Sequence, residues 1–416
     1  MMRRTIIYWI YAALAFPFTS GAAAENRPVE LPGLSVRNGQ LVLAGRPYRG
    51  VGANHFDLFL RILHDPTNTT SLRGLEQLSE AGIPFVRFAT AYGERDYRMY
   101  LTNREDYFHR LDLVVETAKR CKVGLIPSLL WTFDLPDAVG EHRDQWENPK
   151  SKTIGALRQY VGEMVRRYKD SPAIWAWEFG NEPNLSVDLP NAIEFRRTGG
   201  TERDDLKSQH MVAAMTEFAS QVRRHDTWRP VFSGNSHPRP SAWHNAHERN
   251  WKGDSPEQSR LMILRDNPAC LGTLSVHYYG ERDEQGKLTV WTTNRLEWLR
   301  WLKGIARAEQ RPLWVGEFGV RSGNGADTRA AFERMLGDFE AAKVDLAAFW
   351  VFDLDGQKNT WNVTPTNDRA FMLRVAADAN RRWNRALTAQ TDGIPDNRDT
   401  APRGLRANIN STTAKP

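Results

Sequence analysis

Two glutamates in this sequence each end a short apolar stretch, and together they have the chemistry to cleave a glycosidic bond. Glu182 lies at the end of the aromatic-rich stretch 174–184, where Pro183 stops the strand. Glu317 ends the stretch 313–317 in the same manner. Apolar runs without helical periodicity predict buried strands. Glycoside cleavage requires two carboxyl groups, one to donate a proton and one to act as nucleophile or base. The sequence therefore predicts such a pair at the edge of a sheet.

The elements that would position this pair alternate between strand and helix. Strands are predicted near 48–53, 84–89, 123–129, 173–181, 230–235, 272–278, 312–317 and 346–352. Helices, read from apolar residues at helical spacing, are predicted near 70–82, 108–120, 152–168, 204–224, 256–266, 293–308, 327–343 and 368–385. This alternation indicates an α/β protein with a (β/α)₈ TIM barrel. A doubly wound open sheet is the alternative, but no glycine-rich phosphate loop follows the first strand.

Two further features complete the predicted barrel. Residues 34–43 alternate apolar and polar side chains about Asn38-Gly39, which predicts a β-hairpin that caps the bottom of the barrel. Long segments follow several strands, at 133–151, 184–203, 236–255, 279–291 and 353–366. Segments that follow strands lie on the C-terminal rim of a barrel, where the active sites of this fold are found. We therefore expect the two glutamates to meet among these rim loops.

Strand alternation predicts which neighbours share a face with each glutamate. Glu178 lies on the face of Glu182, roughly 13 Å deeper in the barrel at the usual rise. We expect it to be a buried structural carboxylate that meets an arginine. The same rule places Val315 on the inward face with Glu317, and turns Trp314 towards the helices.

Asn181-Glu182-Pro183 and Gly316-Glu317-Phe318-Gly319 resemble the two signatures of glycoside hydrolase family 5, a retaining family of clan A that includes cellulases and mannanases. The resemblance covers residues 34–385, which are expected to form one catalytic domain. It implies a double displacement in which Glu317 is the nucleophile and Glu182 the acid/base.

The resemblance also implies a set of substrate-binding residues. Arg87, in Phe85-Val-Arg-Phe, matches the arginine that holds the nucleophile ionised, and Asn181 is expected to bind the sugar 2-hydroxyl. His277 and Tyr279 match the family's His-x-Tyr, which contacts the sugar and the nucleophile. Trp350 matches the aromatic floor of the subsite at the point of cleavage. The alternative for Asn181 is a residue that only ends its strand, and the alternative for the others is an ordinary role in the core.

The third strand departs from the family pattern, because it ends in Leu129-Leu130-Trp131 where many members have a histidine. Trp131 is compatible with mannanase-like members and joins the predicted substrate-binding residues. Other tryptophans near the rim are candidates for stacking on further sugar rings, with packing inside the loops as an equal alternative: Trp243, Trp291 and Trp361.

No metal or organic cofactor is expected. His244 and His247, followed by Glu248, have a metal-like spacing, but further ligands are missing nearby in the sequence. The chain has 416 residues and a formal net charge of +6, with the basic residues scattered rather than clustered. This charge distribution favours solvated helix faces over a nucleic-acid surface.

Both ends of the chain differ from the predicted domain. Residues 1–24 have a charged start, an apolar run and Ala22-Ala23-Ala24, the pattern of a secretory signal peptide rather than a membrane span. We expect a secreted or periplasmic monomer that leaves the membrane after cleavage. Residues 386–416 are polar and are expected to be a disordered tail. Cys121 and Cys270 precede distant strands, so two buried free thiols are favoured over a disulfide.

The patterns together predict an exported hydrolase of β-1,4-linked polysaccharide or oligosaccharide, of glucan or mannan type. Long rim loops and many aromatic residues favour endo action, although such loops also suit an exo-acting pocket. A non-catalytic sugar-binding barrel and a metal-dependent barrel hydrolase are the alternatives in other classes.

Overall fold

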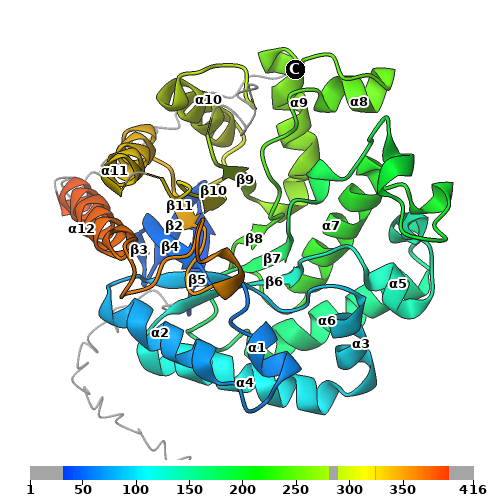
Figure 1. The fold of residues 1–416 in the computed structure, drawn as a ribbon, viewed down its shortest axis with the longest axis horizontal. Helices are drawn as coiled ribbons and strands as arrows, with labels where there is room; N and C mark the ends of the chain where they lie inside the picture. Colours follow the sequence, from blue (N-terminus) through cyan, green and yellow to red (C-terminus); the bar gives the residue numbers. More distant parts are fainter. Residues whose placement is uncertain (1–30, 281–288, 324, 393–416) are drawn as a thin grey trace, which may run out of the picture. The chain divides into compact units, whose positions relative to one another are not determined.

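The computed structural model describes residues 31–280, 289–323 and 325–392, so the predicted signal peptide lies outside the described residues. One sheet has the strand order β8-β7-β6-β5-β4-β11-β10-β9, and the paired strands are parallel. The first and last strands of the alternation, β4 and β11, therefore lie side by side. This cyclic order confirms the predicted (β/α)₈ barrel, and Figure 1 shows helices surrounding the strands.

The barrel strands are β4 (Gly50–Asn54), β5 (Phe85–Ala89), β6 (Gly124–Leu130), β7 (Trp177–Gly180), β8 (Val231–Phe232), β9 (Leu274–Tyr278), β10 (Leu313–Phe318) and β11 (Leu346–Phe349). Each overlaps a predicted strand, but β7, β8 and β11 are shorter than predicted. Strand β8 is followed by Ser233 and then by Gly234, whose φ of 70° is outside the extended region. The main chain after β8 is hydrogen-bonded to a side chain of β9, since Ser233 N donates to Ser275 Oγ at 3.2 Å.

The long helices are α2 (Thr70–Glu80), α4 (Arg104–Cys121), α6 (Lys152–Tyr168), α7 (Ser208–Arg223), α9 (Pro256–Asp266), α10 (Arg295–Ala308), α11 (Gly325–Ala342) and α12 (Phe371–Asp392). Shorter helices lie in the connections: α1 (Leu60–His64), α3 (Glu94–Thr102), α5 (Leu135–Val139) and α8 (Ala242–Glu248). Helix α12 continues to Asp392, so residues 386–392 are helical, and the prediction of a tail from 386 is wrong there. Residues 393–416 lie outside the described residues. Among the described helices, we find none with the length and apolar character needed to cross a membrane.

The predicted hairpin is confirmed at the bottom of the barrel. Strands β1 (Leu34–Arg37) and β2 (Gln40–Leu43) pair across Asn38 and Gly39, and a short strand β3 (Arg46–Pro47) follows. Both turn residues have positive φ, 49° and 71°, as a two-residue hairpin turn of this kind requires. Leu34 and Leu41 pack into the barrel interior against residues such as Phe85 and Trp175. The hairpin thus closes the end of the barrel opposite the rim loops.

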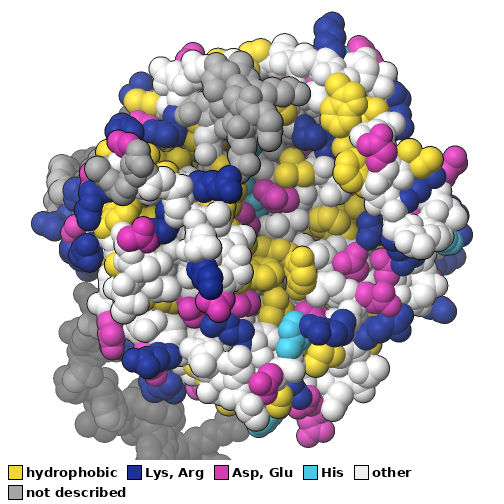
Figure 2. All heavy atoms as spheres, viewed as in Figure 1, with side chains coloured by type: hydrophobic (Ala, Val, Ile, Leu, Met, Phe, Trp, Pro, Cys, Tyr) yellow, Lys and Arg dark blue, Asp and Glu magenta, His cyan; other side chains and the backbone are white. Residues whose placement is uncertain are grey.

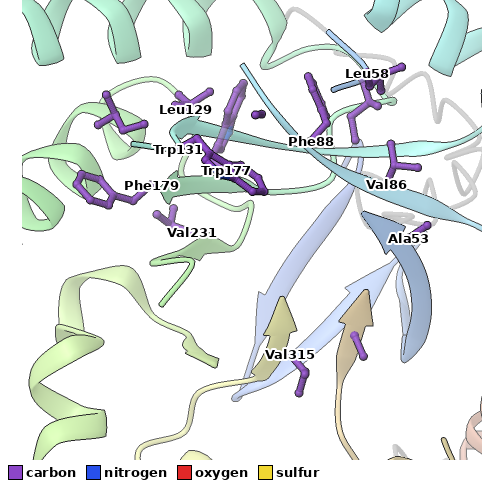
Figure 3. Packing of buried hydrophobic residues seen from close by; sticks show 14 of the residues in the cluster. Ala53, Leu58, Val86, Phe88, Leu129, Trp131, Trp177, Phe179, Val231 and Val315 are labelled. Carbon is purple, nitrogen blue, oxygen red and sulfur yellow. The ribbon is translucent and has the colours of Figure 1, made fainter. Parts of the chain in front are cut away.

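The core has two layers. The inner layer fills the barrel and includes Ile126, Phe232 and Trp314. The outer layer lies between the strands and the helices, and Figure 3 shows part of it, including Val86 and Val315. Both cysteines are free, but the prediction that both are buried is wrong. Cys270 lies exposed in the short turn Ala269–Leu271, and Cys121 is only half-buried.

Candidate active site

Glu182 is held at the rim by its own main chain. It follows β7 with a φ of 51°, a left-handed conformation that a residue other than glycine adopts at a cost of about 1–3 kcal/mol. Its N–H donates to Gly234 O at 2.9 Å, and the preceding Asn181 N–H donates to Trp131 O at 3.2 Å. Neighbouring strands therefore fix this turn from both sides. The side chain is 28% exposed, so it remains accessible from the rim.

Glu317 reaches the barrel interior because β10 contains a bulge. The register with β9 shifts between Val315 and Glu317. Trp314 consequently points into the barrel, where its ring stacks on Phe232 at 5.0 Å, and Val315 joins the outer layer. The prediction that Trp314 faces the helices is wrong, because simple alternation takes no account of an extra residue. Gly316 permits the bulge, since a Cβ there would lie 2.7 Å from His277 Nε2.

Arg87, in the middle of β5, connects the groups around both glutamates. Its Nη1 donates to Glu317 Oε1 at 2.7 Å, and its Nη2 donates to Asn181 Oδ1 at 2.9 Å. Its Nε donates to Glu178 Oε1 at 2.6 Å. Both Arg87 and Glu178 are fully buried, which confirms the predicted structural pair. Hydrogen bonds between ionised groups are stronger than those between neutral groups, and the planar guanidinium of Arg87 fixes several acceptors at once.

Tyr279 and His277 complete the surroundings of the two carboxylates. Tyr279 donates its hydroxyl to Glu317 Oε2 at 2.6 Å. Burial of that hydroxyl and the nearby Glu317 charge hold the pKa of Tyr279 well above its usual value, so it stays a donor. His277 Nδ1 lies 3.0 Å from Glu182 Oε1 and 3.7 Å from Glu317 Oε2. Burial lowers the pKa of His277 to about 4, so its ring is neutral near neutral pH.

The two glutamates are close enough to act on the same bond. Ligand atoms of Glu182, His277 and Glu317 lie within 4.8 Å of one another. Burial raises the pKa of Glu182 above its usual value, and Ser236, Arg87 and His237 oppose that rise only in part. A neutral His277 adds no positive charge that would help Glu182 to ionise. The carboxyl group of Glu182 is therefore biased towards its protonated form. It lies beside the carboxylate of Glu317, which is bound by Arg87 and Tyr279.

Trp350 follows β11 and forms one wall of the site. Its Nε1 donates to Gln357 Oε1 at 2.8 Å, which fixes the orientation of the indole. Trp131 packs against it with ring centroids 6.2 Å apart. The ring of Trp131 also packs against Phe56, with centroids 4.9 Å apart, and the Arg87 guanidinium lies 4.3 Å from its centroid. Trp131 is only 5% exposed, so it supports Arg87 and Trp350 and has no open face for a sugar. Figure 2 shows hydrophobic side chains gathered near the middle of this face, with acidic side chains beside them.

The remaining predicted aromatics and histidines have separate positions. Trp361 packs edge-on against Tyr279 at 5.2 Å, next to the site, whereas Trp243 stacks on His247 at 4.4 Å on α8. His244 Nδ1 lies 2.8 Å from Asp254 Oδ1, which gives this histidine a structural partner. Within the described parts of the chain, the one trio of carboxylate and imidazole ligands close enough for a metal ion is the group around Glu182.

Sequence reasoning missed three residues that support the site. Asn54 ends β4, accepts from Arg87 Nη1 at 3.0 Å, and donates to Gly316 O at 2.9 Å, which steadies the bulge. Ser236 lowers the pKa of Glu182 and so favours its ionised form, and Gln357 accepts a hydrogen bond from Trp350. Asn54 could have been found as a polar residue at the end of a predicted strand. Ser236 and Gln357 lie in loops whose course the sequence pattern does not define.

Comparisons with known proteins agree with this geometry. A sequence model described as cellulase (glycosyl hydrolase family 5) matches residues 49–355. A putative mannan endo-1,4-beta-mannosidase 4 of Arabidopsis thaliana is 26% identical over 333 residues, covering 70% of this chain and 74% of that protein. A probable mannan endo-1,4-beta-mannosidase F of Aspergillus flavus is 30% identical over 121 residues, covering 27% of this chain and 26% of that relative's own length.

The fold has solved counterparts as well. The crystal structure of an endo-1,4-beta-mannanase from Rhizomucor miehei superposes with a TM-score of 0.62 at 17% identity, covering 84% of this chain and 99% of that chain. Identity this low supports the fold alone. The family match extends over most of the described barrel and includes the ends of all eight barrel strands. The chain belongs to the cellulase family, glycosyl hydrolase family 5.

Proposed function

We propose that this protein hydrolyses β-1,4-linked polysaccharide or oligosaccharide of mannan type and retains the configuration at the anomeric carbon. The observation that carries the proposal is the pair Glu182 and Glu317, whose nearest ligand atoms lie within 4.8 Å of each other. Retaining enzymes place their carboxyl groups about 5–5.5 Å apart, whereas inverting enzymes leave about 6.5–9.5 Å for a water. The short separation supports attack by a carboxylate.

Each group has a role that its surroundings support. Glu317 attacks the anomeric carbon, and Arg87 and Tyr279 neutralise and orient its carboxylate. Glu182 donates its proton to the leaving oxygen and then removes a proton from the attacking water. Asn181, fixed by Arg87, is placed to bind the 2-hydroxyl, and Trp350 offers its face to the sugar ring. None of these steps requires a cofactor.

The mannan assignment rests on the relatives, whose names describe mannan endo-1,4-beta-mannosidases. Glucan is the alternative, because the family description also covers cellulases. Endo action is proposed from the same relatives and from the long rim loops. We also propose that residues 1–24 direct export and that the mature protein is a monomer. The mass of the secreted chain tests the first statement, and its elution volume in size-exclusion chromatography tests the second.

Proton NMR of the anomeric signals during hydrolysis of mannan oligosaccharides tests the reaction. We expect the β-anomer to form first, with the α-anomer growing in later by mutarotation. The products from polymeric mannan should include several chain lengths, and cellulose should be a poorer substrate. EDTA should leave the rate unchanged. An α-anomer that forms first would overturn the carboxylate roles, and loss of activity with EDTA would favour the metal-dependent alternative.

Replacing Glu182 with glutamine should lower kcat/KM on mannan by about 10²–10⁴-fold, the range for losing a general acid. A substrate with an activated aryl leaving group needs little protonation, so its glycosylation step should be affected much less. The raised pKa of Glu182 also predicts where wild-type activity falls at high pH. Because the acid must be protonated, kcat/KM should fall only above the usual glutamate range. In the variant, this alkaline fall should disappear with the aryl substrate. Equal losses on both substrates would argue against the acid role.

A further inference from the structure

The loop that follows β11 carries Trp350 and folds back on itself. We call residues 350–363 the Trp350 loop. Its two ends are joined, because Val363 N donates to Val351 O at 2.9 Å. The indole belongs to the same unit, since Trp350 Nε1 donates to Gln357 Oε1 at 2.8 Å. The indole is therefore fixed relative to its own loop, and its orientation over the site depends on where that loop lies.

Arg61 joins the Trp350 loop to the segment that follows β4. It lies on α1, and its Nη1 donates to Asp353 Oδ2 at 2.8 Å. Its Nη2 also donates to the main-chain oxygen of Asp353, and its Nε donates to Asp57 Oδ2 at 2.8 Å. The side chain of Arg61 is only 17% exposed, so water screens these bonds in part. One guanidinium thus holds two oxygens of the loop and is itself held by a third oxygen.

Asp353 has a backbone conformation that depends on such contacts. Its φ is 52°, in the left-handed region that residues other than glycine seldom adopt. Such conformations persist where several contacts determine them. His55 Nε2 lies 3.9 Å from Asp353 Oδ2, but burial and the Arg61 charge lower the pKa of His55 to about 3, so its ring is neutral near neutral pH. Among the described residues, Arg61 is therefore the cation that holds Asp353.

The position of Asp353 affects the position of the Trp350 indole. Asp353 precedes a tight turn in which Gln357 N donates to Leu354 O at 3.0 Å. Gln357 is also the acceptor of the indole hydrogen bond. A shift of Asp353 would therefore pass through this short turn to the indole ring.

We propose that Arg61 is a positioning residue for the hydrolysis, which keeps the face of Trp350 where the sugar ring must lie. Arg61 acts through another residue, since its hydrogen bonds go to Asp57 and Asp353 rather than to a catalytic glutamate. Misplacing reacting groups by about 1 Å can lower a rate by about 10²-fold, so a small tilt of the loop is enough. The inference rests on the proposed function, in which Trp350 offers its face to the substrate.

The experiment compares Arg61→Leu with the wild type in two measurements. In protein labelled with ¹⁵N-tryptophan, the indole N–H signal that Trp350→Phe identifies should shift or broaden in Arg61→Leu, with no substrate present. On a mannan oligosaccharide, kcat/KM should fall by about 10–100-fold, mostly through kcat, because orientation in the transition state is lost. Arg295→Leu is the matched control. It breaks an ion pair with Asp338, at 2.6 Å between α10 and α11, and should leave the Trp350 signal and kcat unchanged.

A double variant separates a positioning role from a general loss of stability. Because Arg61 acts through Trp350, adding Arg61→Leu to Trp350→Ala should lower kcat/KM by less than about twofold further, whereas independent effects would multiply. Unchanged positions of the other indole signals verify that each variant folds. Arg61→Lys keeps the charge but cannot hold all three oxygens, so its kcat/KM should lie between those of the wild type and Arg61→Leu. It replaces Arg61→Leu in every comparison should the leucine variant fail to fold.

The outcomes for Arg61 and for the proposed function can be told apart. Losses that multiply in the double variant would overturn the role of Arg61, as would a Trp350 signal that keeps its wild-type position in Arg61→Leu. Either result with an active wild type refutes this inference alone. A wild type that hydrolyses no β-linked polysaccharide or oligosaccharide refutes the proposed function, and with it the role of Arg61 in the reaction.

Discussion

Replacing Glu317 with glutamine should lower kcat/KM on mannan by about 10⁴-fold or more, on the scale seen when a hydrolase loses its nucleophile. Glutamine keeps the size of the side chain and can still accept from Tyr279, but an amide cannot form the glycosyl ester. The fold should persist, because Arg87 retains Glu178 as a buried partner. The measurement is the initial rate of reducing-sugar release, with folding checked by thermal unfolding. Glu333→Gln, an exposed change on α11, is the matched control and should behave as wild type.

Azide distinguishes the nucleophile from the acid. In Glu317→Ala, azide can enter the space left by the carboxylate and attack the sugar from that face, which gives an α-glycosyl azide. In Glu182→Ala, azide instead attacks the covalent intermediate from the opposite face and gives a β-glycosyl azide. Exchanged products in the two variants would reverse the assigned roles. A Glu317→Ala variant as active as wild type would reopen the possibility of a non-catalytic sugar-binding barrel.

The barrel and the positions of its catalytic pair could be predicted because both depend on local pattern. Apolar strands that end in Glu182 and Glu317 alternate with amphipathic helices, and the fold brings all such strand ends to one rim. The direction of Trp314 could not be predicted, because the bulge at Gly316 depends on contacts with His277 and Asn54 that come from distant strands. Burial of Trp131 beneath Arg87 likewise depends on tertiary packing.

Loop residues also could not be predicted, because their roles depend on tertiary contacts. Gln357 and Ser236 act on Trp350 and Glu182 only because long segments fold back on the rim. Their sequence surroundings are polar and carry no period. The extent of α12 also escaped prediction, since its helical sequence continues into a region whose composition resembles a tail. Composition averages over many residues, whereas a helix end is decided by a few.

Replacing Arg87 with methionine should destabilise the protein by about 3–5 kcal/mol, the usual effect of removing one partner from a buried ion pair. The guanidinium is fully buried and bonded to both Glu178 and Glu317. Methionine fills much of the space, but Glu178, which is also fully buried, keeps only the hydrogen bond from Trp314 Nε1 at 2.9 Å among the described side chains. We expect a clear fall in the midpoint of thermal unfolding. Activity should fall as well, since the Glu317 carboxylate and Asn181 both lose the group that positions them.

Two companion variants separate stability from catalysis. Arg229→Met breaks an equally buried pair with Asp226, at 2.7 Å, at the bottom of the barrel. It should lose comparable stability while its folded fraction keeps the wild-type kcat. Adding Glu178→Gln to Arg87→Met removes the unpaired buried charge and should recover part of the stability, but none of the activity. Recovery of both would show that Arg87 serves the fold alone. Arg87→Lys should remain weakly active, because an ammonium keeps the charge yet cannot span Glu178, Glu317 and Asn181 as a planar fork does.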